Sequence, residues 1–204
     1  MSEIEIIEGD QGTAAWFQMR CGSVGASSMQ KIITTTGKRS AQRKAFLYQM
    51  AAERITGKKT ETYTSKHMEN GILREEDALD AFSFVTGLDI RPVSLIRPTD
   101  NPNYHCSPDS IVVGKEEGVE VKSVIPSTQV KYLDRGTVPT EYIIQVQASM
   151  MVTGWPVWWF ASYCPGMRLL ILPVKRDEKL ISQIRDAVED FCRDLMDLVE
   201  RLKA

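Results

Sequence analysis

The middle of the chain is a series of short runs of β-branched residues, each ended by turn residues, and this pattern most constrains the fold. Three runs stand at 93–96, 110–113 and 119–124, and two more at 157–163 and 169–174. β-branched side chains favour strands, and short runs bounded by Pro, Asn and Gly indicate neighbouring strands. We therefore expect these runs to form one sheet.

Helical periodicity flanks these runs on both sides. We expect helices near 14–19, from about 27, over 40–55, over 72–85, over 140–152 and from about 177 onwards. This order of helices and strands is typical of an α/β (α+β) domain, with a central mixed sheet flanked by helices. The 204 residues suit one domain, 1–204, which ends in a long amphipathic helix.

Several classes of protein are disfavoured by composition. No apolar run is long enough to cross a bilayer, and the acidic N-terminus is unlike a signal peptide, so we expect a cytoplasmic protein. None of the cysteines forms a C-x-x-C pair, which argues against zinc and iron–sulfur sites. We expect free thiols at Cys21, Cys106, Cys164 and Cys192.

The net charge of −2 conceals a basic segment. Between Arg20 and Lys59 the chain holds nine basic residues and one acid, Glu53, which gives +8 there and leaves −10 for the rest. Such a segment indicates either a surface that binds a polyanion or a solvated helix face. Charge alone does not decide between these two.

The strongest local signal is Ser107-Pro108-Asp109 followed by Glu120-Val121-Lys122. Because side chains alternate along a strand, Glu120 and Lys122 share one face. Asp109 stands at the start of the preceding strand. If these two strands pair through the loop 114–118, two carboxylates and an ammonium meet at one end of the sheet.

Such a group suits the hydrolysis of phosphodiesters. Asp109, Glu120 and the carbonyl of Val121 are hard oxygen ligands for Mg²⁺, with Mn²⁺ as an alternative. A bound cation stabilises charge on the phosphate and activates water, while Lys122 can orient or deprotonate that water. The plain alternative is a surface strand with a Glu–Lys pair, since E-x-K alone is a common pattern.

The P-D…E-x-K pattern resembles the signature of the PD-(D/E)-x-K nucleases, and within them the lambda-type phage exonuclease family. The resemblance runs from Trp16 to about Pro165 and implies a restriction-endonuclease-like core. We expect the Trp16 side chain in the hydrophobic core. Five motifs occur in the family's order: Trp16, Arg20, Gly22, Ala26 and Ser27; Gly71 and Glu75; Ser107-Pro108-Asp109; Glu120-Val121-Lys122; and Gln145, Gln147 and Met150.

The resemblance assigns a role to each residue of the catalytic centre. Asp109 and Glu120 resemble metal ligands, and Lys122 resembles the catalytic lysine. Glu75 resembles an acid that helps to hold a second metal ion, although an exposed helix glutamate is the simpler reading of Glu75 alone. Gln145 resembles a glutamine that faces the metal ions and the water.

A second group resembles the residues that hold the DNA end. Arg20, Ser27 and Ser107 resemble a pocket for the 5′-terminal phosphate, and the fork of an arginine binds phosphate oxygens in pairs. A surface ion pair and a helix cap are the plain alternatives for Arg20 and Ser27. Gln147 resembles a glutamine that faces the metal ions and the water less directly than Gln145 does, and a helix-surface amide is its plain alternative. Met68 resembles an apolar wedge between bases, with a buried or functionless loop methionine as the alternative.

The resemblance implies a 5′-to-3′ exonuclease of double-stranded DNA that uses two metal ions, releases mononucleotides and leaves a 3′ overhang. It further implies a homotrimeric ring around the DNA, a single-strand annealing recombinase as partner, and a phage or prophage origin in a bacterial cell. Segment 123–132 lacks an arginine that the family pattern leads one to expect. The alternatives are another PD-(D/E)-x-K endonuclease and a non-catalytic DNA-binding recombination accessory.

Overall fold

The computed structural model describes residues 3–60 and 74–203, and its centre is a mixed sheet of five strands. In spatial order the strands are β3 (Ile90–Arg91), β6 (Ser110–Val112), β7 (Glu117–Ser123), β8 (Val157–Tyr163) and β9 (Leu170–Lys175). Strand β6 pairs antiparallel with β7, and β8 pairs antiparallel with β9, whereas β7 and β8 run parallel along their whole length. The predicted fold class is confirmed.

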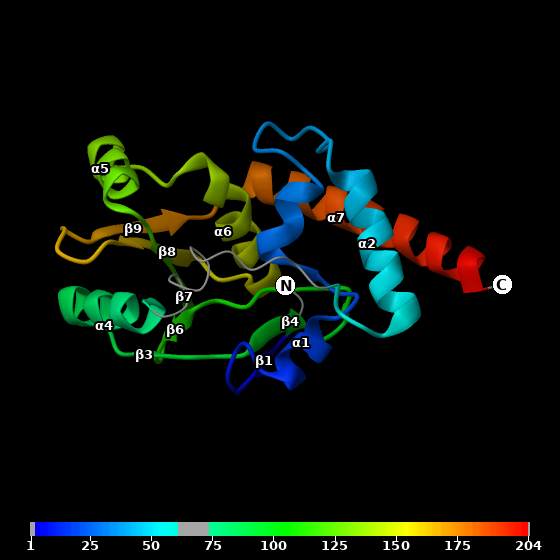
Figure 1. Ribbon diagram of the computed structural model, residues 1–204, viewed down its shortest axis with the longest axis horizontal. Coiled ribbons are helices and arrows are strands. Elements are labelled where there is room, and N and C mark those ends of the chain that lie inside the picture. Colours follow the sequence, from blue (N-terminus) through cyan, green and yellow to red (C-terminus); the bar gives the residue numbers. More distant parts are fainter. Residues whose placement is uncertain (1–2, 61–73, 204) are drawn as a thin grey trace.

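Helices cover both faces of this sheet (Figure 1). On one face α4 (Glu75–Thr86) packs Ala78 and Phe82 against Val119 and Val121 of β7. The larger core lies on the other face and includes α6 (Thr140–Thr153) and α7 (Glu178–Lys203). Because side chains alternate along β7, its residues 118, 120 and 122 face away from α4.

The N-terminal part of the chain packs beside this sheet. Two short pairs of strands lie there: β1 with β4 antiparallel, and β2 with β5 parallel. Their bounds are β1 (Ile4–Ile7), β2 (Val24–Gly25), β4 (Leu95–Pro98) and β5 (Tyr104–His105). The remaining helices are α1 (Ala14–Arg20), the 3₁₀ helix η1 (Ala26–Lys31), α2 (Arg43–Thr56) and α5 (Pro126–Arg135). Helix α2 lies along α7, with the Phe46 and Phe191 rings stacked 5.3 Å apart.

Most predicted elements are present, with shifted ends. The run 93–96 was expected in one sheet with the other four runs, but it forms β4, whose backbone pairs with β1 outside the five-stranded sheet. The edge strand of that sheet is instead β3, which pairs with β6 and was not predicted.

Helix α2 begins at residue 43 rather than 40, because the amide of Arg43 still donates to the carbonyl of Ser40 in a preceding turn. It ends at Thr56, close to the predicted residue 55, and its C-cap Gly57 has a φ of 66°, in the left-handed region. No strand was predicted at 4–7 and no helix at 126–135, so β1 and α5 were missed.

Gly118 is the point of closest approach between β7 and β8. It lies opposite Trp158, which is fully buried, and a Cβ at this position would come 2.5 Å from the indole ring. We expect Gly118→Ala to lower the free energy of unfolding by about 3 kcal/mol, because the core must shift to accept the methyl group. Urea denaturation measures this loss. Glu116→Ala in the exposed neighbouring turn is the control, and equal stability of the two variants would contradict the packing argument.

None of the helices in the described part of the chain combines the length and the apolar character needed to cross a membrane.

Candidate active site

The pairing of β6 with β7 brings Asp109 against the middle of β7. The Asp109 amide donates to the Val119 carbonyl at 3.1 Å, and its carboxylate Oδ2 accepts from the Val121 amide at 2.7 Å. These two contacts continue the register in which Ser110 lies opposite Val119. The predicted meeting of the two motifs is therefore present, and both contacts involve backbone groups of β7.

Glu120 and Lys122 lie on the same face of β7, and their side chains form an ion pair. Glu120 is buried, its Oε1 accepts from the Lys122 ammonium, and the same oxygen accepts from Gln145 Nε2 at 2.5 Å. Gln145 lies on α6, which packs over this face of the sheet. The structure thus joins the carboxylate and the ammonium of one strand to an amide that stands 25 residues further along the sequence.

Two acids of this site have a raised pKa. Burial raises the pKa of Asp109 well above its ordinary value, and the nearby charge of Glu120 adds to the effect. The pKa of Glu75 is also raised, chiefly by burial. For Lys122, burial works to lower the pKa, but the charges of Glu120 and Asp109 outweigh it and raise the pKa. Lys122 is therefore a cation in this arrangement, and the acids would gain from a further positive charge.

These groups fit a small, hard cation that keeps some of its waters. Among the described residues, no three His, Cys, Asp or Glu side chains converge closely enough to form a full set of ligands. Mg²⁺ does not need such a set, because it is held by one or two carboxylates and retains several waters. The raised pKa of the buried Asp109 is what two neighbouring carboxylates without a cation should show.

A cavity of about 190 Å³ connects these residues to the second predicted group. Its lining includes Asp109, Glu120, Lys122 and Gln145 as well as Arg20, Ser27 and Ser107. Two buried polar atoms of the second group, Arg20 Nε and Ser107 Oγ, have no hydrogen-bond partner. Buried polar atoms are almost always satisfied, so these two atoms indicate a missing polar ligand.

Arg20 is held as a free cation. Its guanidinium lies 3.9 Å above the Trp16 ring, and the Trp16 Nε1 donates to the Ser94 carbonyl at 3.0 Å. Burial lowers the pKa of Arg20 to about 10, partly offset by the charge of Glu53, so the side chain stays protonated at neutral pH. No described carboxylate forms an ion pair with Arg20, and an anion could complete its hydrogen bonds.

A second, larger cavity of about 750 Å³ adjoins the first and shares Trp16, Arg20, Gly25 and Ser27 with it. Further lining comes from Lys31 and from the rings of Phe17 and Phe46, among others. Cations and aromatic faces together suit nucleotides.

Three of the described residues that were predicted for the site, Glu75, Val121 and Gln147, do not line the catalytic cavity. Glu75 lines a neighbouring cavity of about 490 Å³ that also includes Asp109. Gln147 bonds to the Lys175 carbonyl and the Asp177 amide, both at 2.9 Å, and so joins α6 to the end of β9 rather than facing the catalytic group. Met68 lies outside the described residues.

Other lining residues were not found from the sequence. Trp16 was expected in the core, yet it is half-buried and supports Arg20. The ring of His105 is buried with its Nε2 unpartnered, next to Gly25. Gln11 reaches the cavity by donating to the Pro108 carbonyl at 2.8 Å. The contacts of His105 and Gln11 join distant segments, so no local pattern predicts them.

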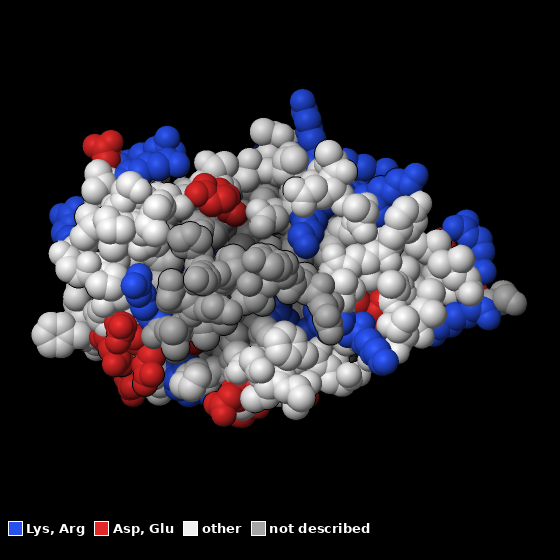
Figure 2. Space-filling model, in the orientation of Figure 1, with Lys and Arg blue, Asp and Glu red and all other residues white. Residues whose placement is uncertain are grey.

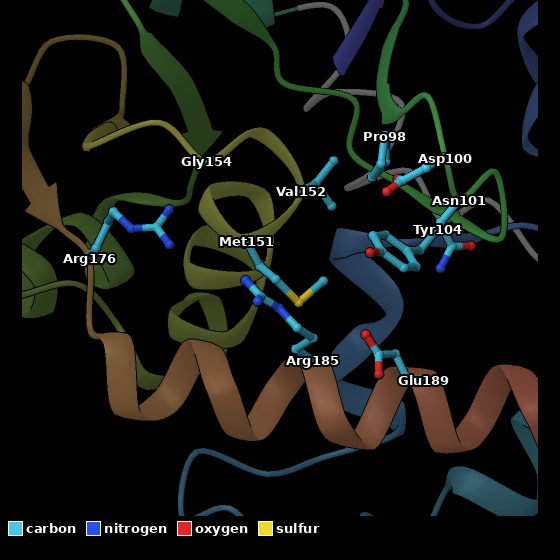
Figure 3. A pocket seen from close by; sticks show the side chains of 10 residues that line it. All are labelled: Pro98, Asp100, Asn101, Tyr104, Met151, Val152, Gly154, Arg176, Arg185 and Glu189. Carbon is cyan, nitrogen blue, oxygen red and sulfur yellow. The ribbon is translucent and has the colours of Figure 1, made fainter. Parts of the chain in front are cut away.

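Another polar cavity, of about 740 Å³, lies between α6, α7 and the β4–β5 turn (Figure 3). Figure 3 shows Arg176 on one side of it, and Tyr104 and Glu189 on the other. Arg176 already donates to the Met150 carbonyl at 2.6 Å and to Glu178. None of the residues predicted to be catalytic lines this cavity.

Charge is unevenly distributed on the face shown in Figure 2. Basic side chains gather over and around α2, which belongs to the basic segment 20–59, whereas acidic side chains gather near α4, whose first turn is acidic. A polyanion would therefore approach from the side of α2.

Comparisons with known proteins agree with this geometry. A family model described as the YqaJ-like viral recombinase domain matches residues 15–156. The alkaline exonuclease LHK-Exo from Laribacter hongkongensis is 27% identical, with a TM-score of 0.84 over 94% of this chain and 96% of that one. Its complex with dAMP gives 28% identity and a TM-score of 0.85 over the same shares. A phage-related exonuclease from Haemophilus somnus 129PT shares the fold, with 17% identity and a TM-score of 0.67 over 88% and 96%. Comparison with curated proteins gave no match.

Proposed function

Because the chain belongs to the YqaJ-like viral recombinase family, we propose that it is a metal-dependent exonuclease that degrades one strand of double-stranded DNA from its 5′ end. The observation that carries this proposal is the cavity shared by Asp109, Glu120 and Lys122 with Arg20, Ser27 and Ser107. One part of that cavity suits a phosphodiester to be cut, and the other suits a terminal phosphate. The alkaline exonuclease LHK-Exo, whose fold covers 94% of this chain, supports the same activity.

The catalytic half of the cavity would hold the scissile phosphate. Asp109, Glu120 and the Val121 carbonyl would bind Mg²⁺ or Mn²⁺, and Glu75 would help to hold a second ion at the edge next to Asp109. A bound divalent cation supplies charge stabilisation and a more acidic water. Lys122 orients that water or a phosphate oxygen, and Gln145 holds the Glu120 carboxylate from the other side.

The other half of the cavity would hold the 5′-terminal phosphate. Arg20 and Ser107 bring buried, unpartnered polar atoms, and Ser27 adds a hydroxyl. If the terminal phosphate binds here while the next phosphodiester lies at Lys122, one nucleotide is released in each cycle. LHK-Exo has been crystallised with dAMP, which is a mononucleotide like those that such a cycle would release.

An assembly around the DNA would explain how a protein of net charge −2 retains a polyanion. We propose a homotrimeric ring whose channel is lined by the basic segment 20–59, with the acidic surfaces turned outwards. The 3′ overhang would then pass to a single-strand annealing recombinase. Light scattering tests the ring, and a monomer at all concentrations would contradict it.

Replacement of Arg20 by alanine should remove the preference for phosphorylated ends. We expect the ratio of kcat/KM for 5′-phosphate over 5′-hydroxyl duplexes to fall by about 10- to 100-fold, since a charged hydrogen bond is worth about 1.5–3 kcal/mol. Release of mononucleotides from linear duplexes with Mg²⁺ measures this ratio.

Arg91→Ala, which removes an exposed cation paired with Glu8, is the matched control and should keep the ratio. An unchanged ratio in the Arg20 variant would contradict the phosphate pocket. Cleavage of closed circular DNA by the wild type would instead indicate an endonuclease.

A further inference from the structure

Glu53 of α2 is a fully buried carboxylate, and it stands outside the catalytic cavity. Four donors satisfy it: the Gly22 amide at 3.1 Å, the Thr60 amide at 3.2 Å, the Lys59 ammonium at 2.9 Å and Gln49 Nε2 at 3.3 Å. Burial works to raise the pKa of Glu53, but the hydrogen bonds from Lys59 and Gly22 outweigh it and lower the pKa. Glu53 is therefore an ion in the interior, which is costly unless it is fully paired.

The contacts of Glu53 fix the turn that follows Arg20. The Gly22 amide binds its carboxylate, and the Cys21 thiol reaches its backbone carbonyl at 3.6 Å. The neighbouring Arg54 donates from Nε to the Gly22 carbonyl at 2.7 Å. Gly22 has φ of +70°, and a Cβ there would lie 2.6 Å from Arg54 Cγ. Helix α2 thus holds this turn through both the amide and the carbonyl of Gly22.

The same turn carries the residues of the phosphate pocket. Arg20 precedes it directly, and Gly25 and Ser27 follow it at the start of η1. The Lys59 ammonium, paired with Glu53, also reaches the Arg20 carbonyl at 3.5 Å. A shift of the turn would therefore displace the guanidinium relative to Ser27.

Glu53 also acts on Arg20 through its charge. Its negative charge works against the lowering of the Arg20 pKa by burial. The two side chains form no ion pair, so the charge stabilises the guanidinium without occupying its donors. A direct partner would block the fork that a phosphate needs.

We propose that Glu53 is the positioning residue of the 5′-phosphate pocket, which holds the Arg20 turn in place and compensates the Arg20 charge while leaving its donors free. This inference rests on the proposed function, because it takes the pocket to bind a 5′-phosphate. The inference adds to the pocket a residue of α2 that stands more than thirty positions after Arg20 in the sequence.

The test compares Glu53→Gln, Arg20→Ala and the double variant on duplexes with 5′-phosphate or 5′-hydroxyl ends. We expect Glu53→Gln to lower the kcat/KM ratio for the two ends by about tenfold or more, mainly through KM for the phosphorylated end. In the Arg20→Ala background the same change should leave the ratio within about twofold, because residues that act through one another are not additive.

The matched control is Glu117→Gln, another largely buried carboxylate, which accepts from Trp159 Nε1 at 2.7 Å far from Arg20. It should keep the wild-type ratio. Glu53→Asp keeps the charge but shortens the side chain, so it should give a partial loss. If Glu53→Gln does not fold, Glu53→Asp carries the test, and a wild-type ratio in that variant overturns the proposal.

A purely structural role predicts a different result, in which Glu53→Gln loses activity equally on both ends and the ratio stays unchanged. That result overturns the proposal, as does a full additional loss of the ratio in the double variant. A wild type without any preference for 5′-phosphate would overturn the phosphate pocket itself, together with this inference. Loss of the preference in Arg20→Ala but not in the Glu53 variants would overturn this inference alone.

Discussion

Lys122→Ala is expected to lower kcat by about a thousandfold, within the range that positioned acid–base and electrostatic groups contribute. The lysine is held against Glu120 on β7, in the cavity that also contains Asp109. In the proposed reaction its cation would lie beside the reacting phosphate or water. Because its interaction strengthens as charge develops in the reaction, kcat should fall while KM for DNA changes little.

Single-turnover release of mononucleotides with saturating Mg²⁺ measures this loss. Lys115→Ala, which removes an exposed lysine from the turn before β7, is the control and should retain wild-type activity. Thermal unfolding of the variant must be followed as well, since Glu120 loses one of its partners. A folded Lys122→Ala protein with wild-type kcat would remove the lysine from the mechanism.

Asp109→Asn is expected to lower kcat by a similar factor of about a thousand and, in the presence of a chelator, to stabilise the fold. The asparagine keeps the shape, and its amide oxygen can still accept from the Val121 amide. It removes a negative charge that would hold the cation, so catalysis should fail. It also removes the repulsion between two buried carboxylates, which is not compensated when the metal ion has been removed.

The sign of the stability effect follows from the raised pKa of Asp109. Burial first, and then the charge of Glu120, raise that pKa in the folded protein above the unfolded value. At a pH above the unfolded pKa of Asp109, its ionised carboxylate therefore lowers the free energy of unfolding. The metal-free protein should become more stable as the pH falls through the raised pKa towards the unfolded value. We expect Asp109→Asn to melt about 3 °C higher than the wild type in chelator.

Calorimetry in EDTA at neutral pH measures this difference, and Mg²⁺ should stabilise the wild type but not the variant. Asp197→Asn on the exposed face of α7 is the control and should show neither effect. A lower melting temperature for Asp109→Asn in chelator would contradict the account of its electrostatics, whatever its activity.

The catalytic part of the site was open to prediction because its geometry is local. Period two along β7 puts Glu120 and Lys122 on one face, and a short antiparallel connection returns Asp109 to that strand. Both features need only a strand pattern and a turn pattern. The contact of Gln145 with Glu120 spans 25 residues, and only the resemblance of motifs pointed to it.

The supports of the site were not open to prediction. Glu53 appeared in the sequence only as the single acid of a basic segment, and its burial depends on an amide 31 residues away. Trp16 was expected in the core because tryptophan is mostly buried, but it forms the floor under Arg20. Gln147 was expected near the catalytic group, yet its amide joins α6 to the β9–α7 connection. Such contacts are set by how distant elements pack.

The fold shows the same division. Helices and strands with a clear period, such as β8 and α7, appear where the pattern placed them. Strand β1 has only four residues, one of them the acid Glu5, and it exists because β4 supplies its hydrogen bonds. Helix α5 begins at Pro126, which suits the first position of a helix, but no helix was predicted there.

The most direct test of the proposed activity is the polarity of degradation. A linear duplex that carries different labels at its 5′ and 3′ ends is incubated with the wild-type protein and Mg²⁺, and the released nucleotides are followed over time. The account predicts early release of the 5′ label as a mononucleotide, late release of the 3′ label, and no release in chelator. Early release of the 3′ label would contradict it, as would cleavage inside the duplex into longer fragments that each keep one labelled end.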